Sequence, residues 1–140
     1  QTILYGLYFK FLNMENVYNR SVVKSFGHAL EGLLHAIKYN RNLRIHFVFA
    51  LIVIAASIFF RVTPFEKGIL GVMILLVISS EMINTAIEEM VNLITSEHRR
   101  EAKIAKDVAA GMVLVAAVGS VIVGAIIFAP HIFKLFYLNY

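Results

Sequence analysis

Residues 108–130 read VAAGMVLVAAVGSVIVGAIIFAP, an uninterrupted run of 23 residues without a charged side chain. At about 1.5 Å of rise per residue, a helix of this length crosses a hydrocarbon core of about 30 Å. The whole chain has the same character, because 59% of its 140 residues are hydrophobic and only 16% are charged. Soluble domains have about 45–50% and about 25%, respectively. The sequence therefore predicts an integral membrane protein.

Two more apolar segments precede this span. Residues 46–60, HFVFALIVIAASIFF, are the apolar centre of a first predicted span over about 43–63. A second span is predicted over about 68–95, and carboxylates appear only in its second half. Together with 108–130, these segments predict three transmembrane helices.

A different pattern covers residues 22–39. Apolar side chains recur there every three or four residues, and charged or imidazole side chains keep the same rhythm on another face. The apolar set is Val23, Phe26, Leu30, Leu33 and Ile37, and the polar set is Lys24, His28, Glu31, His35 and Lys38. The pattern predicts an amphipathic helix at the membrane interface, which is either a surface anchor or the roof of a site.

These segments together predict the fold class. We expect an all-α integral membrane protein with an N-terminal extension over 1–21 and one domain over 22–140. In that domain the N-terminal amphipathic interfacial helix precedes the three transmembrane helices.

The net charge of +4 and the absence of cysteine limit the possible functions. The basic residues cluster beside apolar segments and not in a long run with interleaved aromatic residues. Anionic lipid headgroups are therefore better partners than nucleic acid. Without cysteine there is no disulfide, thiolate metal site or thiol nucleophile, so any chemistry must use oxygen and nitrogen groups.

The distribution of lysine and arginine predicts the orientation. Six of them precede the first apolar segment and four lie between the second and third, whereas the connection between the first two has only Arg61 and Lys67. Positive residues concentrate in cytoplasmic loops. The N-terminus and the loop between the second and third spans are therefore predicted to be cytoplasmic, and the C-terminus external.

Four polar residues recur on one face of the second predicted helix. They are Glu81, Asn84, Glu88 and Asn92, at spacings that place them in one stripe along an otherwise apolar helix. A carboxylate at the centre of a membrane helix costs about 2.5–3.5 kcal/mol on insertion scales, so such residues usually face a bundle interior or a watery cavity. The stripe predicts a functional site. The alternative is that Glu88 and Glu89 lie in water at the helix end while Asn84 joins helices, which explains Glu81 least well.

The following loop, TSEHRREAKIAKD over 95–107, places Glu97, Lys106 and Asp107 at the membrane surface. Taken alone, a lysine and an aspartate before a span are usually an interface anchor and a helix cap.

The stripe and the loop form one longer pattern, EMINTAIEEMVNLITSEHRREAKIAKDVAAGMVLVAA over 81–117, and NRNLRIH lies at 40–46. Over about 25–127 the chain resembles the bacterial membrane diacylglycerol kinase and undecaprenol kinase family, in which E-x-x-N-[ST]-A-[IV]-E is followed by A-K-D at the next span. The resemblance implies a homotrimeric lipid kinase domain in the bacterial cytoplasmic membrane that transfers a phosphoryl group from ATP to a lipid alcohol. NRNLRIH looks more like the undecaprenol kinase branch, which favours undecaprenol over diacylglycerol.

The resemblance also implies roles for individual side chains. Glu81 matches the general base, and Asn84 matches the amide beside it. Glu88 matches a ligand of the magnesium ion that is bound with ATP, and Asn40 takes the place of a second ligand. Further contacts to ATP are implied for Lys106, Asp107, Glu97 and His28. No glycine-rich phosphate loop is present, so ATP would be held by polar side chains.

Some positions depart from the family pattern. Asn40 stands where a glutamate is usual, Asn92 stands where an aspartate is usual, and the loop lacks a tyrosine between Glu97 and His98. An amide oxygen coordinates magnesium without supplying charge. These departures also fit a degenerate family member. A rival of another class is a non-enzymatic helix bundle, such as a transporter or channel subunit in which Glu81 and Glu88 bind or relay cations.

Overall fold

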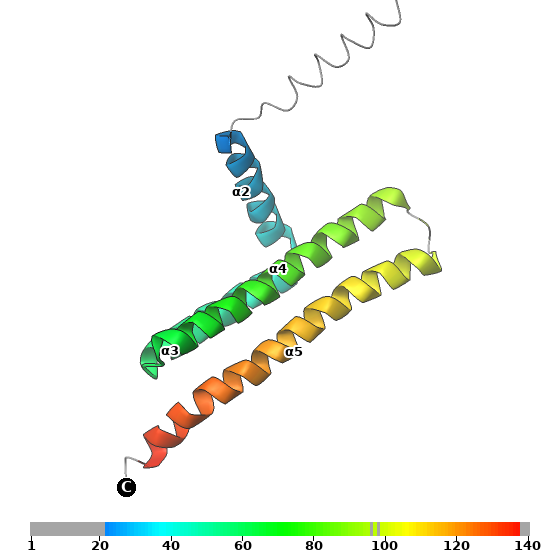
Figure 1. Ribbon diagram of the computed structural model, residues 1–140. Coiled ribbons are helices and arrows are strands. Elements are labelled where there is room, and N and C mark those ends of the chain that lie inside the picture. The colour runs from blue at the N-terminus through cyan, green and yellow to red at the C-terminus, as the bar shows by residue number, and fades with distance from the viewer. Residues whose placement is uncertain (1–21, 96, 98, 138–140) are drawn as a thin grey trace, which may run out of the picture. The chain divides into compact units, whose positions relative to one another are not determined.

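The computed structural model describes residues 22–95, 97 and 99–137, with side chains up to residue 135. The helices of this part are α2 (Val22–Tyr39), α3 (Arg41–Phe59), α4 (Pro64–Ile94) and α5 (Arg100–Tyr137), coloured from blue to red along the chain in Figure 1. The predicted all-α class is confirmed. The N-terminal extension predicted over 1–21 lies outside the described residues.

The three predicted spans are confirmed as helices, although their ends differ from the prediction. α3, α4 and α5 are each long and apolar enough to cross a membrane. The first span was predicted over about 43–63, and α3 runs from Arg41 to Phe59; the second was predicted from about 68, and α4 begins at Pro64. The third span was predicted over 108–130, but α5 is longer at both ends.

The turn between α3 and α4 explains the first of these differences. Thr63 caps α4, since its Oγ1 accepts a hydrogen bond from the Glu66 backbone N–H while the Glu66 carboxylate accepts one from the Thr63 N–H. This reciprocal capping box starts a helix at the next residue, where Pro64 lacks the N–H that would be unpaired anyway. Arg61 has a φ of 52°, in the left-handed region, and this residue reverses the chain after α3.

α5 extends beyond the uncharged segment for two reasons. The polar stretch from Arg100 to Asp107 continues the same helix, because charged side chains are compatible with a helix outside the apolar region. At the other end, Pro130 lies inside the helix and α5 continues to Tyr137. Proline removes one backbone donor, but membrane helices tolerate it where neighbouring groups satisfy the freed carbonyl.

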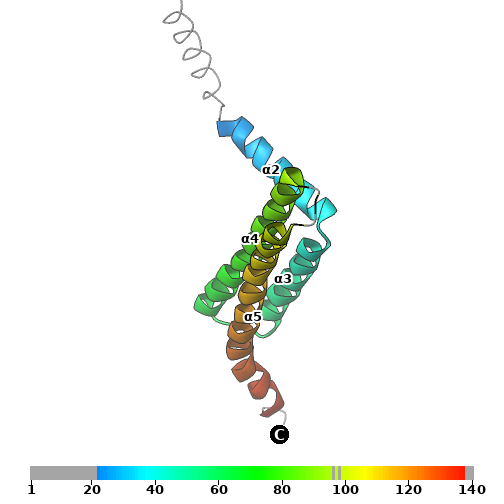
Figure 2. The same ribbon diagram turned by 90° about the vertical axis from the view of Figure 1, so that its right-hand side faces the viewer.

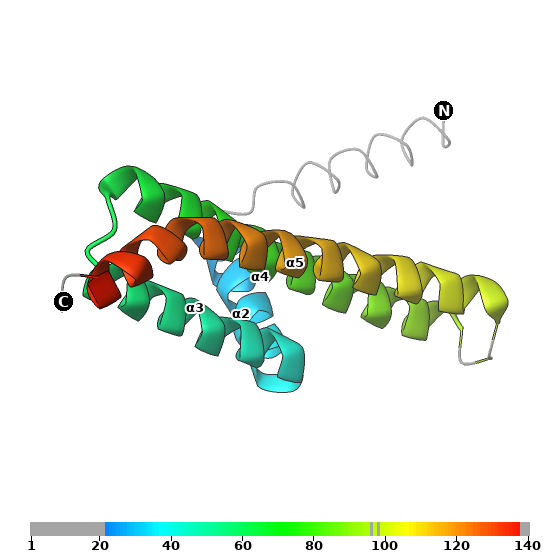
Figure 3. The same cartoon turned by 90° about the horizontal axis from the view of Figure 1, so that it is seen from below.

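α4 is the central helix of the bundle. It packs along the length of α5 and also against α3 (Figures 2 and 3). Close to the α3–α4 turn, the core is formed by Val62, Leu70 and Ile127, with Phe60 packed against them. Further along, small buried side chains such as Ala50, Ala109 and Ala116 let the helices approach closely.

The outer surface of the bundle is apolar. Large side chains such as Leu75, Val115 and Ile126 are more than half exposed. A soluble monomer rarely exposes so large a contiguous apolar surface. Because lipid is the solvent of a transmembrane bundle, these side chains need no protein cover.

The first part of α2, up to His35, forms a unit of its own. Its helix covers the residues predicted for the amphipathic segment, and Val23, Phe26 and Leu30 are exposed. The helix is therefore confirmed, while its position at the membrane interface stays a prediction.

Candidate active site

The polar stripe of α4 passes from the interior of the bundle to its surface. Glu81 is 2% exposed and Asn84 is 4% exposed. Glu88 is half-buried, and Asn92, near the end of the helix, is exposed. The stripe predicted from the sequence is thus a row of polar side chains that begins at a buried carboxylate and ends at an exposed amide.

Two residues of the α3 region approach the buried carboxylate. Asn40 donates a hydrogen bond from Nδ2 to Glu81 Oε1 at 2.9 Å, and the same Nδ2 donates to Thr85 Oγ1. His46 Nε2 lies 4.0 Å from the other carboxylate oxygen, Oε2. Asn40 is in position because it caps α3, where its Oδ1 accepts from the Leu43 backbone N–H at 3.0 Å.

Asn84 has an unsatisfied oxygen. Its Nδ2 donates to Glu88 Oε1 at 3.0 Å, which orients the amide. Its Oδ1 is then buried without a hydrogen-bond partner, and it is the only buried side-chain nitrogen or oxygen among the described residues in that condition. An unpaired buried acceptor costs about 1–3 kcal/mol. Such an atom, on the same helix face as Glu81 and Glu88, can accept a hydrogen bond from a substrate hydroxyl or coordinate a cation.

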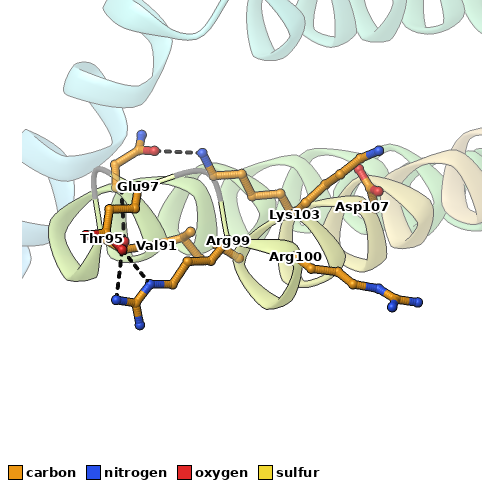
Figure 4. Close-up of a pocket in the computed structure, with 10 residues that line it drawn as sticks. Val91, Thr95, Glu97, Arg99, Arg100, Lys103 and Asp107 are labelled. Atoms are coloured by element: carbon orange, nitrogen blue, oxygen red, sulfur yellow. Dashed lines mark hydrogen bonds and ion pairs between the residues drawn. The ribbon is translucent and has the colours of Figure 1, made fainter.

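A second polar region lies where α4 ends and α5 begins. A cavity of about 780 Å³ is lined there by Asn92, Glu97, Lys106 and Asp107 together with three more cationic side chains, Arg99, Arg100 and Lys103 (Figure 4). Lys106 Nζ donates to Asn92 Oδ1 at 2.6 Å, and Glu97 pairs with Arg99 at 2.9 Å. The cationic lining suits a polyanion such as a nucleoside triphosphate.

An apolar cavity of about 280 Å³ lies between α3, α4 and α5. Phe49, Met73, Val77 and Val121 contribute to its lining, and His46 forms part of its polar wall. His46 links the cavity to the buried carboxylate, because its Nε2 lies 4.0 Å from Glu81 Oε2. An apolar pocket with a few polar groups suits an amphiphilic ligand.

The structure brings together most of the predicted site residues, in two groups. Asn40, Glu81, Asn84 and Glu88 form one group, and Glu97, Lys106 and Asp107 line the cationic cavity with Asn92. His28 belongs to the separate N-terminal unit, where its Nδ1 lies 3.4 Å from Glu31, so its predicted contact to nucleotide stays a prediction.

Sequence reasoning missed Thr85 and His46. Thr85 directly follows Asn84, and its hydroxyl donates to the Glu81 carbonyl oxygen at 2.9 Å. His46 ends the NRNLRIH stretch. The position of His46 in that stretch was the available signal, but only the packing of α3 on α4 shows which carboxylate it approaches.

The carboxylate of Glu88 and the amide oxygen of Asn84 are of the kind that binds magnesium. Magnesium in nucleotide sites is usually held by one or two carboxylates together with substrate phosphates and water. Glu88 supplies a carboxylate, and the unpaired Oδ1 of Asn84 supplies a hard neutral oxygen beside it. Among the described residues, no three acidic or histidine side chains gather into a metal-binding group.

Comparison with known proteins decides the family. Residues 27–128 match the family model described as prokaryotic diacylglycerol kinase. The chain belongs to this family. It is 40% identical over 109 residues to the undecaprenol kinase of Bacillus subtilis (strain 168), a match that covers 78% of this chain and 89% of that protein. It is also 37% identical over 116 residues to the diacylglycerol kinase of Synechocystis sp. (strain ATCC 27184 / PCC 6803 / Kazusa), covering 82% of this chain and 66% of that protein.

Family membership and the three apolar helices together establish a multi-pass membrane lipid kinase. The prediction of family and of enzyme class is confirmed. A lipid kinase binds a phosphoryl donor and a lipid acceptor. The candidate sites for these two ligands are the polar group around Glu81, the cationic cavity and the apolar cavity.

Proposed function

We propose that this protein transfers the γ-phosphoryl group of ATP directly to the hydroxyl of undecaprenol, with Glu81 as general base. The observation that carries the proposal is the buried Glu81 carboxylate, which begins the polar stripe of α4 and lies 4.0 Å from His46, a residue that lines the apolar cavity. A lipid alcohol needs both surroundings, because its chain is apolar and its hydroxyl must meet a polar phosphate donor.

In this step the hydroxyl oxygen forms a bond to the γ-phosphorus, and the bond from that phosphorus to the bridging oxygen of ADP breaks. The hydroxyl proton passes to the Glu81 carboxylate. Glu81 Oε1 is held by Asn40, whereas the neighbour of Oε2 is His46 at 4.0 Å, which is beyond hydrogen-bond distance. Oε2 is therefore the oxygen better placed to accept the proton.

Asn84 and Glu88 act next to the base in this proposal. The unpaired Asn84 Oδ1 is an acceptor for the lipid hydroxyl or a ligand for magnesium, and Glu88 supplies the negative charge that a magnesium ion requires. Magnesium bound with ATP would supply charge neutralisation on the phosphates. The family resemblance also implies Asn40 as a second ligand, but in the structure its amide is engaged by protein groups.

In this proposal ATP binds at the cationic cavity. Lys106 neutralises phosphate charge there, and Asp107 and Glu97 contact the remainder of the nucleotide. Asn92 accepts a hydrogen bond from Lys106 without neutralising it, because the amide carries no charge. The full positive charge of Lys106 is thus available to a phosphate.

Undecaprenol is favoured over diacylglycerol as the acceptor. The Bacillus undecaprenol kinase is matched over 89% of its length and the Synechocystis diacylglycerol kinase over 66% of its length. The proposal includes a homotrimer with shared sites, an active site on the cytoplasmic side and an external C-terminus, which rest on the family resemblance and on the distribution of lysine and arginine.

The test is phosphate transfer from γ-labelled ATP by the purified protein in lipid nanodiscs with magnesium, with undecaprenol and diacylglycerol offered separately. We expect labelled undecaprenyl phosphate, and no label in either lipid with Glu81→Gln. A faster reaction with diacylglycerol would overturn the choice of acceptor. No transfer to either lipid by folded protein, beside an active family member, would favour a degenerate enzyme or a cation-binding bundle.

A further inference from the structure

All the hydrogen-bonding groups of the Asn40 amide meet protein partners. The oxygen accepts from the Leu43 backbone N–H at 3.0 Å, and the nitrogen donates to Glu81 Oε1 at 2.9 Å and to Thr85 Oγ1. An amide nitrogen carries two hydrogens, so both are used. Asn40 is therefore anchored at the start of α3 and directed at one carboxylate of α4.

These contacts fix which way the amide points. If oxygen and nitrogen were exchanged, the oxygen would face the Glu81 carboxylate and the nitrogen would face the Leu43 N–H, and both contacts would be repulsive. The Thr85 hydroxyl donates its own hydrogen to the Glu81 carbonyl oxygen at 2.9 Å. The Thr85 hydroxyl oxygen therefore accepts a hydrogen bond from Asn40, which agrees with a nitrogen of the amide at this position.

The network also crosses between helices. Asn40 caps α3, whereas Glu81 and Thr85 belong to α4, so the contact joins the start of one helix to the middle of another. Glu81 is 2% exposed, and Asn40 is its only side-chain hydrogen-bond donor among the described residues. Among the described residues, Asn40 is thus the side chain that orients the carboxylate by a hydrogen bond.

We infer that Asn40 is a positioning residue that holds the Glu81 carboxylate in its reactive orientation, and that its amide serves this purpose instead of binding magnesium. The inference rests on the proposed role of Glu81. To give its oxygen to a metal, the amide would have to share or release the Leu43 cap. A rotation of the amide would also release both bonds of its nitrogen.

Two substitutions at position 40 separate the two roles. Asn40→Asp keeps an oxygen that caps α3 and adds a charged metal ligand, but it loses the donor to Glu81 and faces it with a like charge. Asn40→Ser keeps a capping hydroxyl that is too short to replace the amide. The measurements are kcat, KM for ATP and the magnesium concentration for half-maximal rate, with the unfolding midpoint as a check on folding.

A positioning role predicts that kcat falls by about tenfold or more in both variants, since each loses a hydrogen bond to a charged group. In Asn40→Ser, KM for ATP and the half-maximal magnesium concentration should stay within about twofold of the wild-type values. Thr85→Val removes the second acceptor of the amide and the hydroxyl's own bond to the Glu81 carbonyl oxygen, but it keeps the Asn40 bond to the carboxylate, so it should lower kcat by a smaller factor.

Other results would overturn the inference. An Asn40→Asp protein with wild-type kcat would show that the hydrogen bond to Glu81 is not needed. A raised magnesium requirement in Asn40→Ser, with kcat unchanged at saturating magnesium, would show that Asn40 is a metal ligand. The wild type and Glu81→Gln are assayed in parallel. An inactive wild type would overturn the proposed function and this inference with it, whereas an active wild type with unaffected position-40 variants would overturn the inference alone.

Discussion

Glu66 and Glu81 both lie on α4, and each carboxylate approaches a histidine of a neighbouring helix. Glu66 Oε2 is 3.8 Å from His131 Nε2 on α5, and Glu81 Oε2 is 4.0 Å from His46 Nε2 on α3. The surroundings differ, because the Glu66 side chain is 25% exposed and that of Glu81 is 2% exposed. The two pairs thus combine the same side chains in different settings.

The local backbone explains one carboxylate and not the other. Glu66 accepts hydrogen bonds from the Thr63 N–H at 2.7 Å and from the Thr63 hydroxyl at 2.8 Å, and this capping box starts α4. Glu81 caps nothing, since it lies within α4, and its donor comes from Asn40 at the start of α3. A buried carboxylate that the helix does not need for its own structure is the better candidate for chemistry.

The largest expected effect tests this contrast directly. Glu81→Gln removes the proton acceptor at constant size, so we expect kcat to fall by about 10²–10⁴-fold. Glu66→Gln is the matched control, because a glutamine in the same position still accepts hydrogen bonds in a capping box. Its kcat should stay within about twofold of the wild-type value. Labelled transfer to undecaprenol is measured for both proteins, and an equal loss in Glu66→Gln would remove the distinction between the two carboxylates.

A smaller effect tests whether the cationic cavity at the end of α4 binds ATP. Lys106→Met removes the ammonium group held by Asn92, and we expect KM for ATP to rise by about tenfold, the effect of losing one charge-assisted hydrogen bond. Lys67→Met is the matched control next to Glu66, where the side chain is exposed and should not affect KM. The measurement is KM for ATP at saturating lipid. If Lys67→Met raised KM as much, the effect would reflect net charge and not the cavity of Figure 4.

The fold was predictable where one physical property dominates. The uncharged run 108–130 and the two segments before it gave three spans, and the amphipathic pattern over 22–39 matches the bounds of α2. The ends of the spans were less predictable. Arg100–Asp107 is charged and Pro130 interrupts the hydrogen-bond pattern, yet α5 includes both, since a helix continues into water and tolerates one missing donor.

The site was predictable along one helix but not between helices. Helical periodicity placed Glu81, Asn84 and Glu88 on one face, because their spacing is a local property of α4. The partners that α3 contributes depend on how the two helices pack. The contacts of Asn40 and His46 with Glu81 span 41 and 35 positions of the sequence, and neither follows from periodicity.

The smallest expected effect concerns the structural carboxylate. Thr63→Ala removes the hydroxyl of the capping box at Glu66, and losing such a cap lowers stability by about 0.5–2 kcal/mol. We expect that loss in the free energy of unfolding in detergent, while kcat at a temperature where both proteins are folded stays at the wild-type value. Thr63→Ser, which keeps the hydroxyl, should restore most of the lost stability. A fall in kcat for Thr63→Ala without a loss of stability would mean that the α3–α4 turn affects the chemistry at Glu81, and that the two regions of α4 do not act independently.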